Sequence, residues 1–120
     1  MSEKKAAIGK DEQIQVAIEA ATEKKGHRVV CIDVEGLCSY TDAILVMSGE
    51  SDRQVQAIGD RVARAMRNRG WKPLGQEGGR SGWVLLDFGD VVVHIFREDL
   101  RDFYDIEKLW VDAPKQELGA

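Results

Sequence analysis

Cysteine and proline are scarce in this chain, and their scarcity excludes some classes of protein. Its 120 residues include two cysteines and two prolines. Cys31 and Cys38 are accompanied by no further cysteine pair and no histidine pair at metal-ligand spacing. The sequence therefore predicts neither a structural zinc site nor a disulfide-stabilised scaffold. We expect both cysteines to be buried, small apolar residues in a reducing compartment.

Long apolar runs and excess positive charge are lacking as well. The longest apolar run, Ala43 to Met47, is far too short to cross a bilayer, and the start, MSEKKAAIGK, has no signal-peptide core. These features predict a cytoplasmic protein with no membrane segment. The formal net charge of -4 argues against binding dominated by nucleic-acid phosphates and favours a protein partner.

Two segments of the chain have helical periodicity. In the first, from Asp11 towards Gly26, apolar residues recur every three or four positions. The second runs from Asp52 to about Arg69, with Ser51 or Asp52 as its N-terminal cap and Gly70 beyond its end. Both patterns are typical of amphipathic helices that pack one face on a core.

The remaining segments predict strands, turns and two tails. Residues 28–34 and 43–48 are expected to be central strands, 71–74 a short edge piece and GQEGGRSG, residues 75–82, a mobile loop. A strand pair and one or two short helices follow. We expect an α+β fold, a mixed sheet with helices packed on it, as a single domain over 11–113 with flexible tails at 1–10 and 114–120.

The most strand-like stretch is VLLDFGDVVVHIFRE, residues 84–98, although Asp87 and His94 interrupt its apolar run. A two-residue turn at Gly89-Asp90 pairs the two halves as a hairpin. Side chains alternate along a strand, so this register makes one face wholly apolar. Asp87 and His94 then lie on the other face and do not interrupt the core. They are diagonal neighbours within reach of a hydrogen bond to each other, and equally able to point at solvent or a partner.

That second face of the hairpin allows two interpretations. It combines two large aromatic residues, Trp83 and Phe96, with a charge and an imidazole, which is the composition of an interface centre. Alternatively, the C-terminal segment folds over the face and buries the aromatic rings as ordinary core. The pattern leaves both interpretations open, and a partial version of each is compatible with it.

Several stretches, in this order, resemble the ribosomal silencing factor family, also called the Iojap family. They are DVEGLCSYTD at 33–42, SGESDRQV at 48–55, PLGQEG at 73–78, WVLLDFGDVVVHIF at 83–96 and R-x-x-Y-x-x-E-K-L-W at 101–110. The resemblance covers roughly residues 10 to 111. Several ordered motifs at family-like spacing are more specific than any one of them.

The resemblance implies a function that composition does not supply. Members of the family bind ribosomal protein fourteen on the large ribosomal subunit and hinder joining of the small subunit, which silences translation when nutrients are scarce. Organelle relatives assist large-subunit assembly. From the hairpin and the family's C-terminal motif we predict eight partner-binding residues: Trp83, Asp87, His94, Phe96, Arg101, Tyr104, Glu107 and Trp110.

The resemblance also implies a fold similar to that of nucleotidyltransferases, which raises an enzymatic alternative. Those enzymes hold metal with two acids one residue apart on a strand, after a Gly-Ser near a helix start. Here SGESD at 48–52 is a partial likeness, and Asp87 and Asp90 lie three apart across a turn. We therefore predict no enzyme activity, no catalytic residue, no cofactor and no metal.

A second alternative is a contact with ribosomal RNA. One face of the second predicted helix carries four arginines, Arg53, Arg61, Arg64 and Arg67. Asp52 and Asp60 dilute this charge, and exposed helix faces are commonly charged, so a solvated face is the competing interpretation. An exposed aromatic face also leaves open a homodimer off the ribosome.

Overall fold

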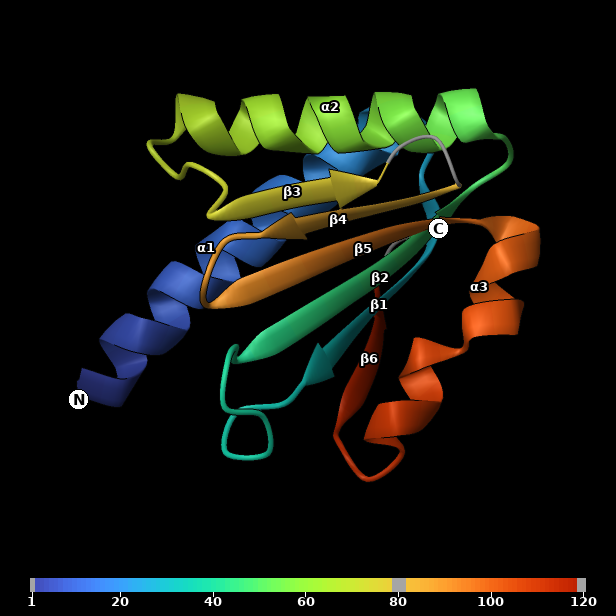
Figure 1. Ribbon diagram of the computed structural model, residues 1–120. Helices are drawn as coiled ribbons and strands as arrows, with labels where there is room; N and C mark the ends of the chain where they lie inside the picture. Colours follow the sequence, from blue (N-terminus) through green and yellow to red (C-terminus); the bar gives the residue numbers. More distant parts are fainter. Residues whose placement is uncertain (1, 79–81, 119–120) are drawn as a thin grey trace.

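The computed structural model describes residues 2–78 and 82–118, with side chains described for residues 11–78 and 82–117. It contains a mixed six-stranded sheet, three α-helices and a short 3-10 helix (Figure 1). In chain order the elements are α1 Ser2–Glu23, β1 His27–Asp33, β2 Ala43–Gly49, α2 Asp52–Asn68, β3 Gly75–Gly78, β4 Trp83–Asp87, β5 Val91–Arg97, α3 Glu98–Tyr104, the 3-10 helix η1 Ile106–Trp110 and β6 Lys115–Leu118.

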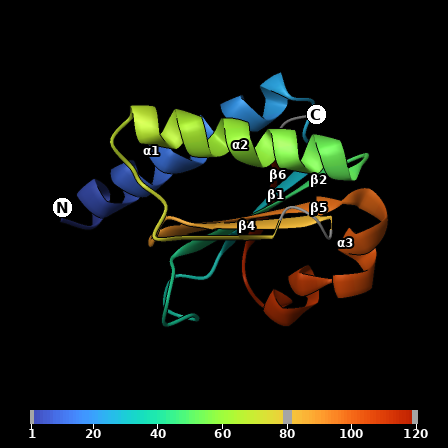
Figure 2. The ribbon, with the colours of Figure 1, turned by 45° about the horizontal axis from the view of Figure 1, so that its top comes forward.

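The strands are ordered β3-β4-β5-β2-β1-β6, so the hairpin β4–β5 lies next to β2 in the sheet. β2 and β5 run parallel, and the other neighbouring strands are antiparallel. Helices α1 and α2 cover one face of the sheet, while α3 and η1 lie against part of the opposite face (Figure 2). The second face is thus partly covered by the C-terminal segment.

Helix α2 shows why this segment folds as the sequence predicts. At its N-terminus the Ser51 hydroxyl accepts a hydrogen bond from the Gln54 N–H at 3.1 Å. At its C-terminus Gly70 adopts a φ of 89°, which lets the Trp71 N–H donate to the Met66 carbonyl at 2.9 Å. The apolar face between these ends is buried against the sheet. The predicted caps and the predicted core face are therefore confirmed.

The register predicted for the hairpin is confirmed as well. Leu86 pairs with Val93 and Val84 with Ile95, and Gly89 in the turn has a positive φ of 89°. All four of these strand residues are buried in the core under α1 and α2. The alternation of side chains on β4 and β5 therefore separates the two faces as the sequence pattern indicates.

Three predicted boundaries are wrong. The first helix starts at Ser2 rather than Asp11, so residues 2–10 continue the helix instead of forming a tail. Residues 115–118 form β6, which pairs antiparallel with β1, because the outer edge of β1 offers unpaired backbone groups to the chain end. The edge strand before the hairpin, β3, is Gly75–Gly78 rather than 71–74 and thus takes half of the predicted loop.

No helix among residues 2–78 and 82–118 is long and apolar enough to span a bilayer.

Candidate partner-binding surface

The second face of the hairpin carries a cluster of aromatic rings, which we call the aromatic face: Trp83, His94, Phe96 and Tyr104. Three of them project from β4 and β5 because their positions alternate with the core residues. The fourth, Tyr104, comes from the last turn of α3, which folds back over the sheet. The face thus joins residues that a strand pattern and a separate helical motif had each predicted.

Trp83 is the centre of this face. Its ring centroid lies 5.3 Å from that of Phe96 and 5.2 Å from that of Tyr104, and the Phe96 ring is stacked nearly parallel to it. Such offset aromatic contacts are worth about 0.5–1.5 kcal/mol beyond the area that they bury. Trp83 nevertheless remains half-buried, so part of its ring is available to a partner.

His94 lies beside Trp83 but is buried, with 8% of its surface exposed. The Trp83 Nε1–H donates to His94 Nδ1 at 3.1 Å, which requires an unprotonated Nδ1 and therefore places a neutral ring's proton on Nε2. Burial lowers the pKa of His94 from 6.5 to about 4, because the charged form would lose its hydration. His94 is thus neutral at pH 7 and orients the Trp83 indole.

Asp87 is half-buried at the end of β4, and its carboxylate accepts the Gly89 N–H at 2.8 Å. This bond stabilises the hairpin turn. Tyr40, in the β1–β2 loop, lies near enough to Asp87 that the carboxylate helps to raise the pKa of the tyrosine, after partial burial and the neighbouring Cys38. Tyr40 is 63% exposed, so it extends the accessible surface beside Asp87.

Arg101 is the largest fully buried side chain of the protein's described residues, at 2% exposure. Its Nε–H donates to Glu107 at 2.9 Å and its Nη1–H donates to the Ser48 hydroxyl at 2.9 Å and to the Arg28 carbonyl. Arg101 therefore fastens α3 and η1 to β1 and β2. The spacing of the motif R-x-x-Y-x-x-E is the spacing that lets Arg101 and Glu107 meet across the turn between α3 and η1.

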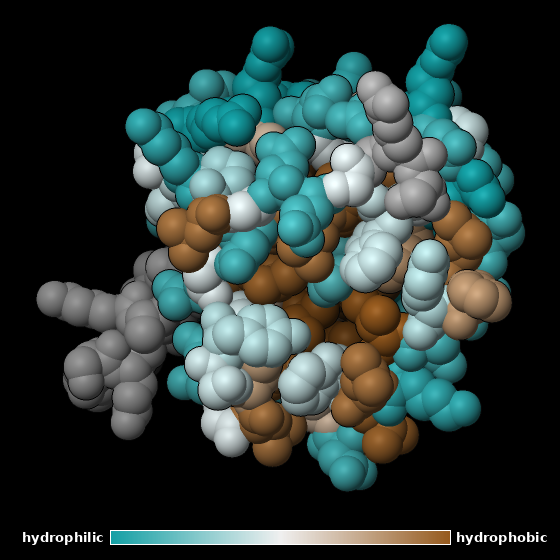
Figure 3. Space-filling model, in the orientation of Figure 1, coloured by the Kyte–Doolittle hydropathy of each residue, from teal (hydrophilic) through white to brown (hydrophobic). Residues whose placement is uncertain are grey.

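Trp110, at the end of η1, is half-buried against a second, smaller core that includes Phe96 and the outward residues of β1 and β2. This packing answers the question that the sequence left open. The C-terminal segment covers Phe96 and the residues of β1 and β2 on the second face, whereas Trp83 and Asp87 on the hairpin keep accessible surface. Apolar surface is visible on this side of the molecule between polar margins (Figure 3).

The eight predicted contact residues therefore fall into two groups. Phe96 is 0% exposed and Arg101 2%, so neither can touch a partner in this conformation, and His94 is nearly buried. We assign these three a supporting position beneath the surface, because stacking and buried hydrogen bonds remove them from contact. The accessible members are Trp83, Asp87, Tyr104, Glu107 and Trp110, and their contact with a partner remains a prediction.

Sequence reasoning missed Tyr40, because it lies in a loop that was interpreted as turn structure. The available signals were an aromatic residue in the loop EGLCSYTD and the family-like motif at 33–42 that contains it, and this loop lies far from the hairpin in sequence. The sheet order places this loop beside the hairpin turn, since the Asp90 carbonyl accepts the N–H groups of Asp42 and Ala43. Proximity of the two loops is a tertiary effect.

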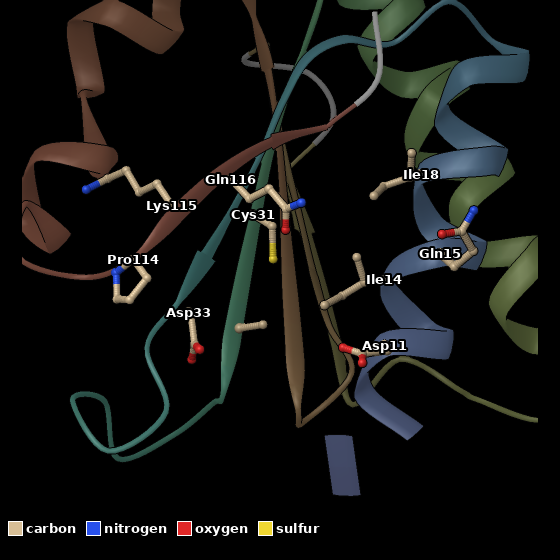
Figure 4. A pocket seen from close by; sticks show the side chains of 10 residues that line it. Asp11, Ile14, Gln15, Ile18, Cys31, Asp33, Pro114, Lys115 and Gln116 are labelled. Carbon is tan, nitrogen blue, oxygen red and sulfur yellow. The ribbon is translucent and has the colours of Figure 1, made fainter. Parts of the chain in front are cut away.

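The helical side of the molecule offers a different kind of hollow. A groove of about 940 Å³ lies between α1 and the β1–β6 edge of the sheet, where Ile14 and Ile18 point towards Cys31 (Figure 4). The side chain of Lys115 is drawn away from this groove, because its ammonium group donates to the Trp110 carbonyl at 2.6 Å. None of the predicted contact residues lines this groove.

The four arginines of α2 lie on the helical side as well. Arg53, Arg64 and Arg67 are exposed, whereas Arg61 forms an ion pair with Glu23 of α1 at 3.1 Å. Arg61 thus links the two helices, which reduces the charge that the stripe presents to solvent. The arginine face lies across the sheet from the aromatic face.

Comparison with known proteins gives consistent results. The family described as "Ribosomal silencing factor during starvation" matches residues 7–120. The ribosomal silencing factor RsfS of Halalkalibacterium halodurans is 39% identical over 112 residues, which are 92% of this chain and 96% of that protein. RsfS of Bacillus subtilis is 39% identical over 106 residues, 88% and 90% of the two chains.

Solved structures and a distant relative extend this comparison. A crystal structure from Chromobacterium violaceum superposes with a TM-score of 0.81 at 38% identity and covers 92% of each chain. A mouse protein named "Mitochondrial assembly of ribosomal large subunit protein 1" is 25% identical over 107 residues, and the match spans 47% of its length.

Proposed function

The chain belongs to the family of ribosomal silencing factors, and from this premise we propose that it binds the large ribosomal subunit and blocks joining of the small subunit. The proposed contact on the large subunit is ribosomal protein fourteen, as the resemblance implies, and the proposed occasion is nutrient limitation, in keeping with the family's description. The name of the mouse relative supports the large subunit as the partner. The chain would act as a regulator, in the cytoplasm.

The observation that carries this proposal is the half-open aromatic face around Trp83. Trp83 packs against both Phe96 and Tyr104, so it presents a large, rigid, amphipathic surface. The entropy cost of ordering this side chain is already met within the fold. Steric exclusion needs one good interface of about 800 Å² per partner and a compact body. The principal extents of 42 × 33 × 26 Å provide such a body.

Sedimentation with separated subunits and with assembled ribosomes tests the function directly. We expect the protein to co-sediment with large subunits and to lower the yield of assembled ribosomes when small subunits are added afterwards. Migration with neither subunit, or binding without any effect on joining, would contradict the proposal. A second copy of the chain could use the same face off the ribosome, and the sedimentation coefficient of the free protein tests this alternative.

A pair of tryptophan variants tests the surface. Trp83→Ala is expected to weaken binding to large subunits by about thirtyfold, or about 2 kcal/mol, if Trp83 is an interface hot spot. Trp71→Ala is the matched control, because Trp71 is also half-buried but packs on the helical side of the sheet. Equal losses in the two variants, or no loss in a folded Trp83→Ala protein, would remove the aromatic face from the interface.

A further inference from the structure

Three potential metal ligands meet at the edge of the molecule where α3 begins. His27 is the first residue of β1, Glu50 directly follows β2, and Glu98 is the first residue of α3. His27 Nε2 lies 2.9 Å from a Glu50 carboxylate oxygen and 3.1 Å from one of Glu98. The three ligand atoms all lie within 4.8 Å of one another, and a small movement of the exposed Glu50 side chain would let one cation contact all three.

The two nitrogens of the His27 ring face different groups: Nδ1 faces a backbone carbonyl, and Nε2 faces the two carboxylates. Its Nδ1 lies 3.4 Å from the Lys25 carbonyl oxygen, which can only accept, so the tautomer with its proton on Nδ1 can donate there. Nε2 then faces two carboxylate oxygens, which also accept only. A proton on Nε2 or a metal ion would each satisfy these carboxylate oxygens. A histidine that donates its other ring N–H to a carbonyl is the usual orientation of a metal ligand.

Backbone and ion-pair geometry hold two of these ligands in place. The β1–β2 register shifts between His27 and Val30, and Arg28 within this irregularity has a φ of 50°. Such bulges re-aim side chains at the edge of a sheet. The Arg28 guanidinium pairs with one oxygen of Glu98 and leaves the other oxygen facing His27. Arg28 therefore orients Glu98 in the way that an outer partner orients a metal-binding carboxylate.

The charge balance of the cluster fits a divalent cation. Glu50, Glu98 and Asp102 contribute three negative charges, and Arg28, which lies 3.7 Å from Asp102 as well, contributes one positive charge. With a neutral imidazole the sum is -2, which one divalent ion neutralises. A proton on His27 would leave a net charge of -1.

We propose that His27, Glu50 and Glu98 bind a divalent transition-metal ion. One imidazole and two carboxylates suit Zn²⁺ or Mn²⁺, with the remaining coordination positions open to water or to a ligand from a partner. The site would join the starts of β1 and α3 to the end of β2, and α3 carries Tyr104 to the aromatic face. The ion would thus stiffen the helix that borders the proposed interface. We predicted no metal from the sequence, because the three ligands of this site are far apart in the chain.

Calorimetric titration of the full-length protein with Zn²⁺ and, separately, with Mn²⁺ tests this proposal, with thermal unfolding as a second measurement. We expect one equivalent to bind and the midpoint of thermal unfolding to rise by about 5 °C or more near saturation. His27→Gln and Glu50→Gln should each weaken binding at least about tenfold. Glu50 has a 71% exposed side chain, so its variant is expected to fold normally.

Two controls distinguish this site from adventitious binding. Glu77→Gln removes an exposed carboxylate from β3 and should leave affinity unchanged. A Cys31→Ser, Cys38→Ser double variant tests the thiols as alternative ligands and should also bind normally. No binding of either ion at 100-fold molar excess, unchanged affinity in His27→Gln, or loss only in the cysteine variant would each overturn the proposal. These measurements use the free protein, so they are independent of ribosome binding.

Discussion

At the scale of single residues, Arg101 and His94 are polar side chains that the fold almost removes from water. Arg101 keeps its charge, because Glu107, Ser48 and a backbone carbonyl accept its N–H groups. No ionised group in the described part of the chain pairs with His94, which remains neutral with Trp83 as its hydrogen-bond donor. The two residues therefore respond differently to mutation and to pH.

Replacement of Arg101 by methionine is expected to lower the free energy of unfolding by about 3 kcal/mol or more. The change leaves Glu107 without its partner and removes the donor to the Ser48 hydroxyl and the Arg28 carbonyl. Removing one partner of a largely buried ion pair is strongly destabilising. Urea-induced unfolding measures the change. Arg64→Met, on the exposed face of α2, is the matched control and should shift stability by less than about 0.5 kcal/mol.

His94 should make stability depend on pH in the acidic range. Its pKa is about 4 in the folded protein and near 6.5 in the unfolded chain, so unfolding takes up a proton between these values. Its contribution is complete above pH 6.5 and falls as the pH drops towards 4. Between pH 7 and pH 5 we expect a loss of roughly 2 kcal/mol from this residue.

The His94→Gln variant isolates this contribution. Glutamine keeps an acceptor for the Trp83 indole but does not titrate, so the variant should lose less stability than the original protein between pH 7 and pH 5. Urea unfolding at the two pH values gives the difference, and any constant effect of the substitution cancels. An identical pH dependence of both proteins would show that His94 titrates normally.

At the scale of elements, the two edge strands β3 and β6 are unusual. Their sequences, GQEG and KQEL, have neither the alternation nor the β-branched and aromatic residues that mark a strand. They form because the adjacent strands β4 and β1 offer unpaired backbone N–H and C=O groups. Periodic sequence patterns report which side chains are buried. They therefore do not predict a strand that is held mainly by backbone hydrogen bonds.

Removal of β6 by ending the chain at Pro114 tests its contribution to the sheet. In an antiparallel ladder alternate residues bond to the same neighbour, and Asp33 donates to the Pro114 carbonyl. The amides of Val29 and Cys31 should therefore face β6 and exchange hydrogen faster in the shortened protein. Amides of Leu45 and Val46 in central β2 serve as the internal control. Unchanged exchange at Val29 and Cys31 would show that β6 does not protect the edge.

At the scale of the whole molecule, the sheet separates two surfaces of different character. Helices α1 and α2 lie on one side of the sheet, and α3 and η1 lie on the other (Figures 1 and 2). The arginines of α2 therefore belong to the helical side, and the aromatic face belongs to the side of α3 and η1. When a protein partner binds the aromatic face, the arginines of α2 point away from that partner. The interpretation of the arginines as a solvated face follows from this arrangement and from the Arg61–Glu23 pair.

An Arg64→Ala, Arg67→Ala double variant tests that interpretation. We expect retention on large subunits to stay within about twofold of the original protein, and the dependence of binding on salt to remain unchanged. Sedimentation at low and moderate salt measures both. A large loss of binding together with a shallower salt dependence would instead assign these arginines to a ribosomal RNA contact. A Trp83→Ala sample in the same series provides the positive control.

Sequence patterns alone determined much of this protein, because helices and hairpins are specified by residues close in the chain. The caps and apolar stripe of α2, the register around Gly89 and the placement of Asp87 and His94 outside the main core follow from local periodicity. The ordered motifs were enough to indicate the family, which the comparisons confirm. The likeness to nucleotidyltransferases stays a prediction from that resemblance.

Only the tertiary structure decided which motif residues are accessible. Phe96 and Arg101 carry the same motif signal as Trp83 and Tyr104, yet packing between β5 and α3 buries the first two. The approach of Tyr40 to the hairpin, the pairing of β6 and the meeting of His27 with Glu50 and Glu98 depend on strand order. A single sequence does not show which distant residues are close in space, because local periodicity relates only residues that are near one another in the chain.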